Sequence, residues 1–352
     1  MTSQQLKGTI LATGAAGGIG TGWLHEHLQS EHARSHLTIY VTHPSFPGQL
    51  REILDKEGDG CRFEIVEIDL SILENVKIFT RVLSGRVESN DIPRIRLLIL
   101  IAGVMFLDPT TKDGIGFTTE GFEKTWALNY AANVCLILGL LPVMSEKGRI
   151  VWLASSSHDP SFRTSRPLYT PGTVSLFKAG DGEVERFAKA TDKIEEGDEV
   201  HGAVRRYAAS KLSMTMFMYA LQRRLSSSSS FNQIKILANS PGTVGGTSIT
   251  SSMPWYVRMV MQYLLVPLQA LFVLIWGNGN LRTAKVAGGD LQWCCWSTEL
   301  KGGDYVDGRE VITSSPESLN IKKQKCLWVG TRKLLGLKEE MTALGDGIQG
   351  GF

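Results

Sequence analysis

Short apolar runs alternate with helical patterns through the first two thirds of the chain. Runs that predict strands occupy residues 9–13, 37–42, 63–68, 96–102, 149–154 and 234–238. Helical patterns lie between them, beginning near Thr21 and covering 71–83, 121–141 and 203–225. Strands that are apolar on both faces and separated by helices form a parallel sheet with helices on each side. We therefore predict a single α/β domain with a doubly wound parallel sheet.

Two segments interrupt this alternation. Residues 159–204 carry Pro, Gly and Thr and then an acidic stretch over 181–199, so they are predicted to be an inserted lid with a solvated acidic helix. Residues 249–281 form the second interruption, and 259–281 contain no charge. Beyond it, 282–352 are predicted to form a helix over 282–296, a last strand over 305–312 and a tail.

The uncharged stretch 259–281 is long enough for a membrane span, which needs about 20 apolar residues. Pro267 interrupts it, and Gln262 and Gln269 mark one polar stripe. The helix and strand predicted after it would complete the same sheet and cannot lie across a membrane. We interpret 249–281 as an apolar substrate lid whose residues 259–281 can also contact a membrane surface. A buried core helix stays open as the alternative.

Composition narrows the class of protein. The 352 residues can bury a large core, and a net charge of +2 without a basic run argues against a nucleic-acid partner. The Cys residues show no metal-ligand or disulfide spacing, so we expect no metal site and free thiols. Residues 1–8 are polar and lead straight into a strand, without the pattern of a signal peptide. We expect a reducing, cytoplasmic location.

A glycine turn with the sequence TGAAGGIG, residues 13–20, follows the first strand and opens a helix. Glycine lets the backbone approach a pyrophosphate closely, and the helix N-terminus favours its charge. A tight turn without a ligand would also use glycine, but the position after the first strand favours a dinucleotide. The candidate residues are Thr13, Gly14, Gly18, Ile19 and Gly20.

The end of the second strand distinguishes NAD from NADP. An acid there would bind the ribose hydroxyl and repel a 2′-phosphate. This chain has Thr42-His43-Pro44-Ser45 and no acid, which favours NADP(H) over NAD(H) and makes His43 a candidate contact. An ordinary loop is the alternative.

Tyr207 and Lys211 are four residues apart, which places both on one face of a helix. A nearby cation favours a phenolate, so the pair is predicted to lower the phenol pKa from its usual value of about 10 and to move a proton. An incidental Lys on a surface helix gives the same spacing. The pair indicates a catalytic site only in combination with the other motifs of the chain.

These motifs occur in the order typical of the short-chain dehydrogenase/reductase family, which the chain resembles over most of residues 8–248. Residues 13–20 match the family's cofactor turn, and 149–156 (RIVWLASS) match the strand that carries its catalytic serine. The other matching positions are Asp69, Leu70, Ala102, Gly103, Asn129, Ser155, Tyr207, Lys211, Pro241, Gly242 and Val244. Residues 119–123 and 102–105 resemble the retinol-dehydrogenase-like branch and related fungal biosynthetic reductases.

The resemblance implies a Rossmann fold and a role for each catalytic position. Tyr207 would be the general acid in reduction, or the base in oxidation, and Ser155 would bind the substrate oxygen. Lys211 would lower the Tyr207 pKa and hold the nicotinamide ribose, and Asn129 would anchor a water. Ser156 or Ser157 stays open as the active hydroxyl. Asp69 and Leu70 would lie beside the adenine, and Pro241 and Gly242 beside the nicotinamide.

The chain departs from the family at two places. Leu100 and Ile101 stand where the family has two Asn before Ala102, which removes polar contacts that support the central strand and the cofactor. Gly246 stands where the family has a Thr that contacts the nicotinamide amide, and Thr247 follows one position later.

The resemblance implies an NADP(H)-dependent oxidoreductase that interconverts a ketone or aldehyde and an alcohol. The apolar lid favours a bulky apolar substrate of polyketide, sterol, retinoid or terpenoid type, as in secondary metabolism. A non-redox cyclase or isomerase and a cofactor-binding protein are the alternatives, and the intact Asn-Ser-Tyr-Lys set argues against both. A homodimer through the helices over 121–141 and 207–225 stays open, because the insertion could interfere with it.

Overall fold

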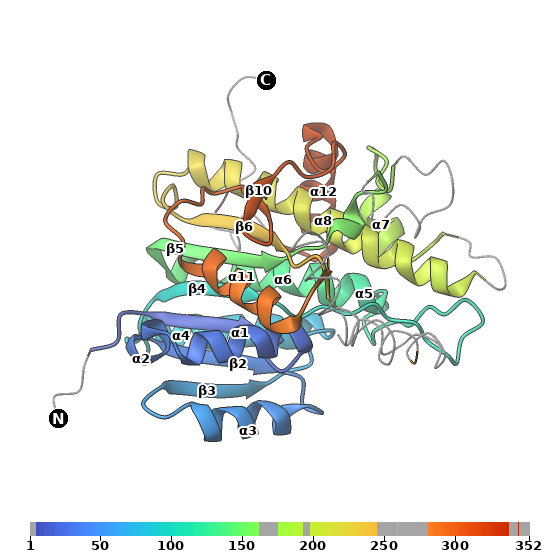
Figure 1. Ribbon diagram of the computed structural model, residues 1–352. Helices are drawn as coiled ribbons and strands as arrows, with labels where there is room; N and C mark the ends of the chain where they lie inside the picture. Colours follow the sequence, from blue (N-terminus) through green and yellow to red (C-terminus); the bar gives the residue numbers. More distant parts are fainter. Residues whose placement is uncertain are drawn as a thin grey trace.

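Figure 1 shows the computed structural model of the protein, which describes residues 5–161, 175–192, 198–244 and 281–337 together with Met259 and Leu344. An eight-stranded sheet lies at its centre, in the order β10-β9-β6-β5-β4-β1-β2-β3. Every pairing in this sheet is parallel except that of β9 with β10. The strands are β1 (Thr9–Thr13), β2 (Leu37–Thr42), β3 (Arg62–Glu67), β4 (Ile95–Leu100), β5 (Met144–Leu153), β6 (Lys235–Ser240), β9 (Tyr305–Asp307) and β10 (Glu310–Ile312). The predicted doubly wound sheet is confirmed.

Residues 305–312 form a hairpin and not the single strand that we predicted. β9 continues the parallel sheet beside β6, and β10 turns back against β9. Gly308 has a φ of 62°, a left-handed conformation that glycine adopts without strain. The Asp307-Gly308 pair is a hairpin signal that the apolar residues around it had obscured.

Helices cover both faces of the sheet and enclose two apolar cores. One core includes side chains of α1 (Gly18–Leu28), α3 (Pro47–Glu57) and α11 (Ala284–Trp296). The other includes side chains of α4 (Leu73–Glu88), α6 (Ala132–Leu140) and α8 (Glu199–Ser227). The remaining short elements are α2 (Glu31–Ser35) and a separate pair of strands, β7 (Thr243–Val244) with β8 (Leu281–Arg282).

The helix predicted over 121–141 runs from Lys124 to Val143 and changes type along its length. It begins as α5 (Lys124–Trp126), widens into the π-helix η1 (Ala127–Ala131), continues as α6 and ends in the 3-10 turn η2 (Leu141–Val143). Among the described residues, it is the helix that is long and apolar enough to cross a membrane, but 83% of its apolar window is buried inside the fold. Its apolar character therefore fits a core helix. The proposed lid 249–281 lies outside the described residues except for Met259 and Leu281.

The predicted tail contains a helix, α12 (Ile321–Leu334), that covers the outer side of α8 (Figure 1). The Trp328 ring stacks on Phe217 of α8 with 5.1 Å between centroids. The Thr331 hydroxyl lies 2.7 Å from the Tyr130 hydroxyl of η1. The helices that the resemblance offered for dimerisation are thus partly covered by the chain's own C-terminal helix. Its polar and apolar positions alternate at helical spacing, a signal that the prediction passed over.

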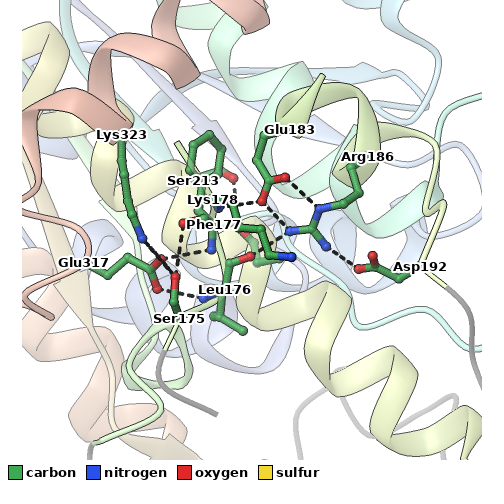
Figure 2. Close-up of polar contacts among 11 residues, drawn as sticks. Ser175, Leu176, Phe177, Lys178, Glu183, Arg186, Asp192, Ser213, Glu317 and Lys323 are labelled. Carbon is green, nitrogen blue, oxygen red and sulfur yellow. Dashed lines mark hydrogen bonds and ion pairs between the residues drawn. The ribbon is translucent and has the colours of Figure 1, made fainter. Parts of the chain in front are cut away.

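Two carboxylates fasten the described part of the insertion, as Figure 2 shows. Glu317 accepts hydrogen bonds from the Ser175 hydroxyl at 2.6 Å and from the Leu176 and Phe177 amides at 2.9 Å. Lys323 of α12 donates to the same carboxylate at 2.5 Å. In the short helix α7 (Glu183–Ala188), Glu183 is buried and accepts from the Lys178 amide at 2.6 Å.

The prediction of a purely solvated acidic helix was therefore wrong for α7. Glu183 and Phe187 are buried, and the Arg186 guanidinium binds both Glu183 and Asp192. Sequence spacing does not show which acids of an acidic stretch meet a buried donor.

Replacing Glu317 with alanine should lower the free energy of unfolding by about 2–4 kcal/mol, because it leaves two backbone N–H groups and an ammonium without their acceptor. Urea unfolding measures this, and proteolysis should then cut first near residues 175–178. Glu310→Ala is the matched control, since Glu310 is exposed. Equal stability of the Glu317→Ala and Glu310→Ala variants would contradict the proposed anchoring.

Candidate active site

The site lies at the carboxyl ends of the central strands. In this strand order the connections leave β1 and β4 toward opposite ends of the sheet, and such a switch point opens a crevice where ligands bind. The glycine turn follows β1, Ala102 and Gly103 follow β4, the serine segment follows β5, and Pro241 and Gly242 follow β6. The fold thus brings together four segments that the sequence had singled out separately.

Glycines 14 and 20 permit a turn that no other residue would allow. Gly14 has a φ of 71°, and a Cβ there would lie 2.6 Å from the Ala102 nitrogen. A Cβ on Gly20 would lie 2.0 Å from the Gly14 carbonyl oxygen. The first turn of α1 contains no acid, and no side chain caps its N-terminus within the described residues. These features fit a pyrophosphate at the helix N-terminus.

The second strand ends beside Asp69. The His43 Nε2 lies 3.7 Å from the Asp69 Oδ2, and both side chains are partly exposed. The other carboxylate oxygen accepts hydrogen bonds from the amide and hydroxyl of Ser71, which fixes the turn before α4. Leu70 is buried. His43 is therefore the polar side chain that the end of β2 presents at this edge.

Asn129 lies in the π-helix η1 and holds the segment after β4. Its Oδ1 accepts from the Val104 amide at 2.8 Å, and its Nδ2 donates to the Val104 carbonyl at 2.8 Å. Nδ2 also lies 3.0 Å from the Ser210 hydroxyl of α8. The π-turn explains how a fully buried amide faces a strand-end loop. Asn129 thus links β4, η1 and α8 at the site.

The Ser155 hydroxyl is oriented by Ser157. Ser157 donates to the Ser155 Oγ through its amide at 3.2 Å and through its hydroxyl at 2.9 Å. A hydroxyl has two acceptor sites and one donor, so these contacts leave the Ser155 proton to point elsewhere. Tyr207 is its partner, because a hydrogen bond from Ser155 lowers the pKa of that phenol. Ser155, the serine favoured by the alignment, therefore contacts Tyr207.

The expected direction of the Tyr207 pKa was wrong. Burial raises the pKa of the Tyr207 phenol to about 12, and the Ser155 hydrogen bond offsets this only in part. The Lys211 Nζ lies 5.6 Å from the centroid of the Tyr207 ring, but burial lowers the pKa of its own ammonium to about 7. The spacing of the pair predicted their proximity but omitted the cost of placing two charges in a buried site.

Lys211 is held by backbone groups. Its Nζ donates to the Leu153 carbonyl oxygen at 2.7 Å, just before the serine segment. A Cβ on Gly103 would lie 3.5 Å from this Nζ and 3.4 Å from the Asn129 Oδ1, so Gly103 adjoins both groups. The four predicted catalytic residues, Asn129, Ser155, Tyr207 and Lys211, thus meet at one place.

An apolar wall adjoins the Tyr207 phenol. Met105 and Leu107, after β4, pack with Ala203 and Val204 of α8 against the Tyr207 ring. The described part of the insertion lies on another side of α8, where Leu176 and Phe187 line a cavity of about 170 Å³ with Trp126, Arg206 and Ala209. The inserted lid predicted over 159–204 is described only in part, because residues 162–174 and 193–197 lie outside the described residues.

The structure describes one of the two departures from the family pattern and not the other. Leu100 and Ile101 are both buried and each joins one of the two apolar cores, so packing replaces the polar contacts that two Asn would make. Gly242 has a φ of 69°, as a turn after β6 requires, and Val244 pairs with Arg282. Gly246 and Thr247 lie outside the described residues.

The sequence reasoning missed His158, which contacts the serine segment from behind. Its Nδ1 lies 2.7 Å from the Ser155 carbonyl oxygen. The only signal in the sequence is a His three residues after the candidate serine, in Ser155-Ser156-Ser157-His158.

Comparisons with known proteins agree with this geometry. No protein-family model matches the chain. The short-chain dehydrogenase iccH of Talaromyces variabilis is 28% identical over 92% of this chain and 94% of its own length. The human polyprenol dehydrogenase is 24% identical over 93% of this chain and 84% of its own length.

A solved structure, that of the angucycline C-6 ketoreductase LanV with bound NADP, has the same fold. It superposes with a TM-score of 0.56 and 18% identity over 90% of this chain and 98% of LanV. This chain has the strand order, the glycine turn and the Asn-Ser-Tyr-Lys cluster described above. Its curated relatives match it over nearly its whole length. The chain is therefore similar to short-chain dehydrogenases/reductases over nearly its whole length, and the comparisons support an oxidoreductase of that type.

Proposed function

We propose that this protein is an NADP(H)-dependent reductase or dehydrogenase that interconverts a ketone or aldehyde and an alcohol on a bulky apolar substrate. The observation that carries the proposal is the cluster of Ser155, Tyr207 and Lys211 beside the glycine turn, at the carboxyl edge of the sheet. A proton donor, an oxygen-binding hydroxyl and a buried cation are the groups that carbonyl reduction needs from the protein.

The chain's own residues fit a dinucleotide. Gly14, Gly20 and the uncapped N-terminus of α1 would receive the pyrophosphate, and Lys211 and Asn129 lie where the nicotinamide ribose would bind. Such a cofactor supplies or accepts the hydride. Ser155 would hold the substrate oxygen, and Tyr207 would donate the proton to that oxygen in reduction and accept it in oxidation.

Two observations support an apolar substrate. The Tyr207 ring packs against Met105, Leu107, Ala203 and Val204, which form an apolar wall beside the phenol. Among the relatives, one is named for a polyprenol, which is a long apolar alcohol, and one solved structure is an angucycline C-6 ketoreductase. The lid proposed over 249–281 would extend this wall.

The experiment is a titration of the purified chain with NADPH and with NADH, read by tryptophan fluorescence, followed by NADPH consumption with a panel of apolar ketones. Tighter binding of NADPH and turnover of any panel member support the proposal. Binding without turnover would favour a non-redox role on the same fold. Failure to bind either cofactor would overturn the proposal.

Cofactor preference should depend on His43. His43→Asp is expected to weaken NADPH binding by at least about tenfold, equivalent to about 1.4 kcal/mol, and to leave NADH binding equal or tighter. A carboxylate at the end of β2 would repel the 2′-phosphate and bind the ribose hydroxyl instead. The same fluorescence titration measures the ratio of the two dissociation constants. His201→Asp, at an exposed position on α8, is the control. An unchanged ratio in His43→Asp would exclude His43 from the cofactor site.

The position of α12 affects how two copies of this chain could form a dimer. Because α12 packs against η1 and α8, we infer that this protein does not dimerise through bare faces of those two helices. Sedimentation of the full chain tests this inference, and a dimer that persists when Val329, an exposed residue of α12, is replaced by Glu would not use that surface of α12.

A further inference from the structure

The segment that carries Ser155 is held by a buried histidine. His158 ends the 3-10 turn η3 (Ser156–His158) and has an exposed fraction of 2%. Its Nδ1 lies 2.7 Å from the Ser155 carbonyl oxygen. Its Nε2 lies 3.2 Å from the amide nitrogen of Ser315, far along the chain. The ring therefore bridges the serine segment and the C-terminal region.

The two contacts determine which ring nitrogen carries the proton. A backbone N–H can only donate, so Nε2 must accept from Ser315 and be unprotonated. The proton of the neutral ring is then on Nδ1, which donates to the Ser155 carbonyl. Burial lowers the pKa of His158 and keeps the ring neutral. The Tyr305 ring packs beside it, with 5.1 Å between centroids.

The C-terminal end of this bridge lies in a turn that is held by several hydrogen bonds. Residues 314–318, which we call the serine turn, bond to themselves and to α8. The Ser318 hydroxyl donates to the Ser315 carbonyl at 2.6 Å, and the Ser314 hydroxyl lies 2.7 Å from the Tyr219 hydroxyl. Glu317 of the same turn binds the insertion (Figure 2). A bond to the serine turn therefore ties Ser155 to a rigid part of the molecule.

We propose that His158 is a positioning residue for catalysis. It holds the backbone of Ser155 so that the hydroxyl, which already accepts two bonds from Ser157, directs its one proton at Tyr207, or at the substrate oxygen when a substrate is bound. His158 itself neither touches the substrate nor transfers a proton. This inference rests on the proposed function, because it assigns a task to a neighbour of the proposed catalytic serine.

Kinetics of three variants test the inference with the ketone found in the panel. His158→Ala should lower kcat by about 10- to 100-fold, because a displacement near 1 Å at a reacting group can cost about 100-fold. The dissociation constant for NADPH should stay within about twofold, since the glycine turn does not depend on His158. His158→Asn can still donate from the position of Nδ1, so it should recover most of kcat. His201→Ala, an exposed histidine, is the matched control.

A second measurement does not require turnover. Nitrogen NMR of labelled histidine rings at about pH 8, with His158→Asn to assign the signal, should show a neutral ring protonated on Nδ1. A ring protonated on Nε2 would overturn the inference.

The outcomes separate this inference from the proposed function. Full kcat in His158→Ala beside an inactive Tyr207→Phe would overturn the inference alone. Full kcat in Tyr207→Phe would overturn the proposed function. Equal loss of kcat and of NADPH binding in His158→Ala, without recovery in His158→Asn, would reduce His158 to a structural residue and overturn its positioning role.

Discussion

Tyr207→Phe is expected to lower kcat for ketone reduction by about two to four orders of magnitude. The change removes one oxygen atom, and with it the group that donates the proton to the substrate oxygen. Packing should persist, because the Tyr207 ring stays against Met105, Ala203 and Val204. The NADPH dissociation constant should therefore change little, while steady-state turnover almost disappears.

The control for this variant is Tyr130→Phe. The Tyr130 hydroxyl is also buried and hydrogen-bonded, but its partner is Thr331 of α12 and not a site residue. It should cost about 1 kcal/mol of stability and leave kcat close to wild type. Retention of kcat in Tyr207→Phe would remove the acid–base role of Tyr207 and assign the proton transfer to another group. Parallel loss in both variants would point to damage in the packing around η1 and α8.

The sequence predicted the residues of this cluster but not their electrostatics. The spacing of Tyr207 and Lys211 and the strand before Ser155 were sufficient to place all three at one edge of the sheet. The pKa directions depend on burial of the two side chains, which is set by elements far away in sequence. Met105 and Leu107 after β4 and the Leu153 carbonyl of β5 surround the pair, and no local pattern reports such contacts.

The fold itself followed from short buried strands separated by helices, whereas the strand order came from the structure. The predictions that were wrong or missing concern features that depend on tertiary contacts or on single turn residues. Gly308 broke the last strand into a hairpin. The helix α12 is stabilised in part by Trp328, which packs on α8, and by Thr331, which contacts η1. The sequence alone does not show that α12 packs against these two helices. His158 was missed for the same reason, since its acceptor and donor come from opposite ends of the fold.

Reduction by this enzyme should slow as the pH rises through about 7, because the pKa of Lys211 is lowered to about 7 by burial. When Tyr207 donates its proton it becomes a phenolate, and a protonated Lys211 stabilises that charge. Above this pH the amine is neutral and the stabilisation is lost. Oxidation should have the opposite slope, because Tyr207, whose pKa is raised to about 12, must first lose its proton. The pH profiles of kcat/KM in the two directions measure these slopes.

Lys211→Met and Lys211→Arg separate charge from packing. The Met variant should reduce ketones slowly at every pH, about 10²-fold more slowly than the wild type at pH 6. Its pH profile should lack the limb near pH 7, which is the fall in rate that deprotonation of Lys211 causes. A guanidinium stays charged to a pH above about 12, so Lys211→Arg should lose the limb near pH 7 wherever it retains activity. A limb that stays near pH 7 in the Met variant would assign it to another group.

Stability gives a second test of the same pKa, one that does not depend on turnover. The unfolded chain keeps Lys211 protonated up to its usual pKa of about 10.4, whereas the folded chain releases this proton near pH 7. Between these values the unfolded state binds more protons, so the free energy of unfolding should rise with pH over this window. Lys211→Met should remove that rise, which urea unfolding at about pH 7 and pH 9 would show against Lys147→Met, a change at the edge of β5 away from the site. An equal rise in the two variants would mean that Lys211 stays charged in the folded protein, and the pH limb of reduction would then belong to another group.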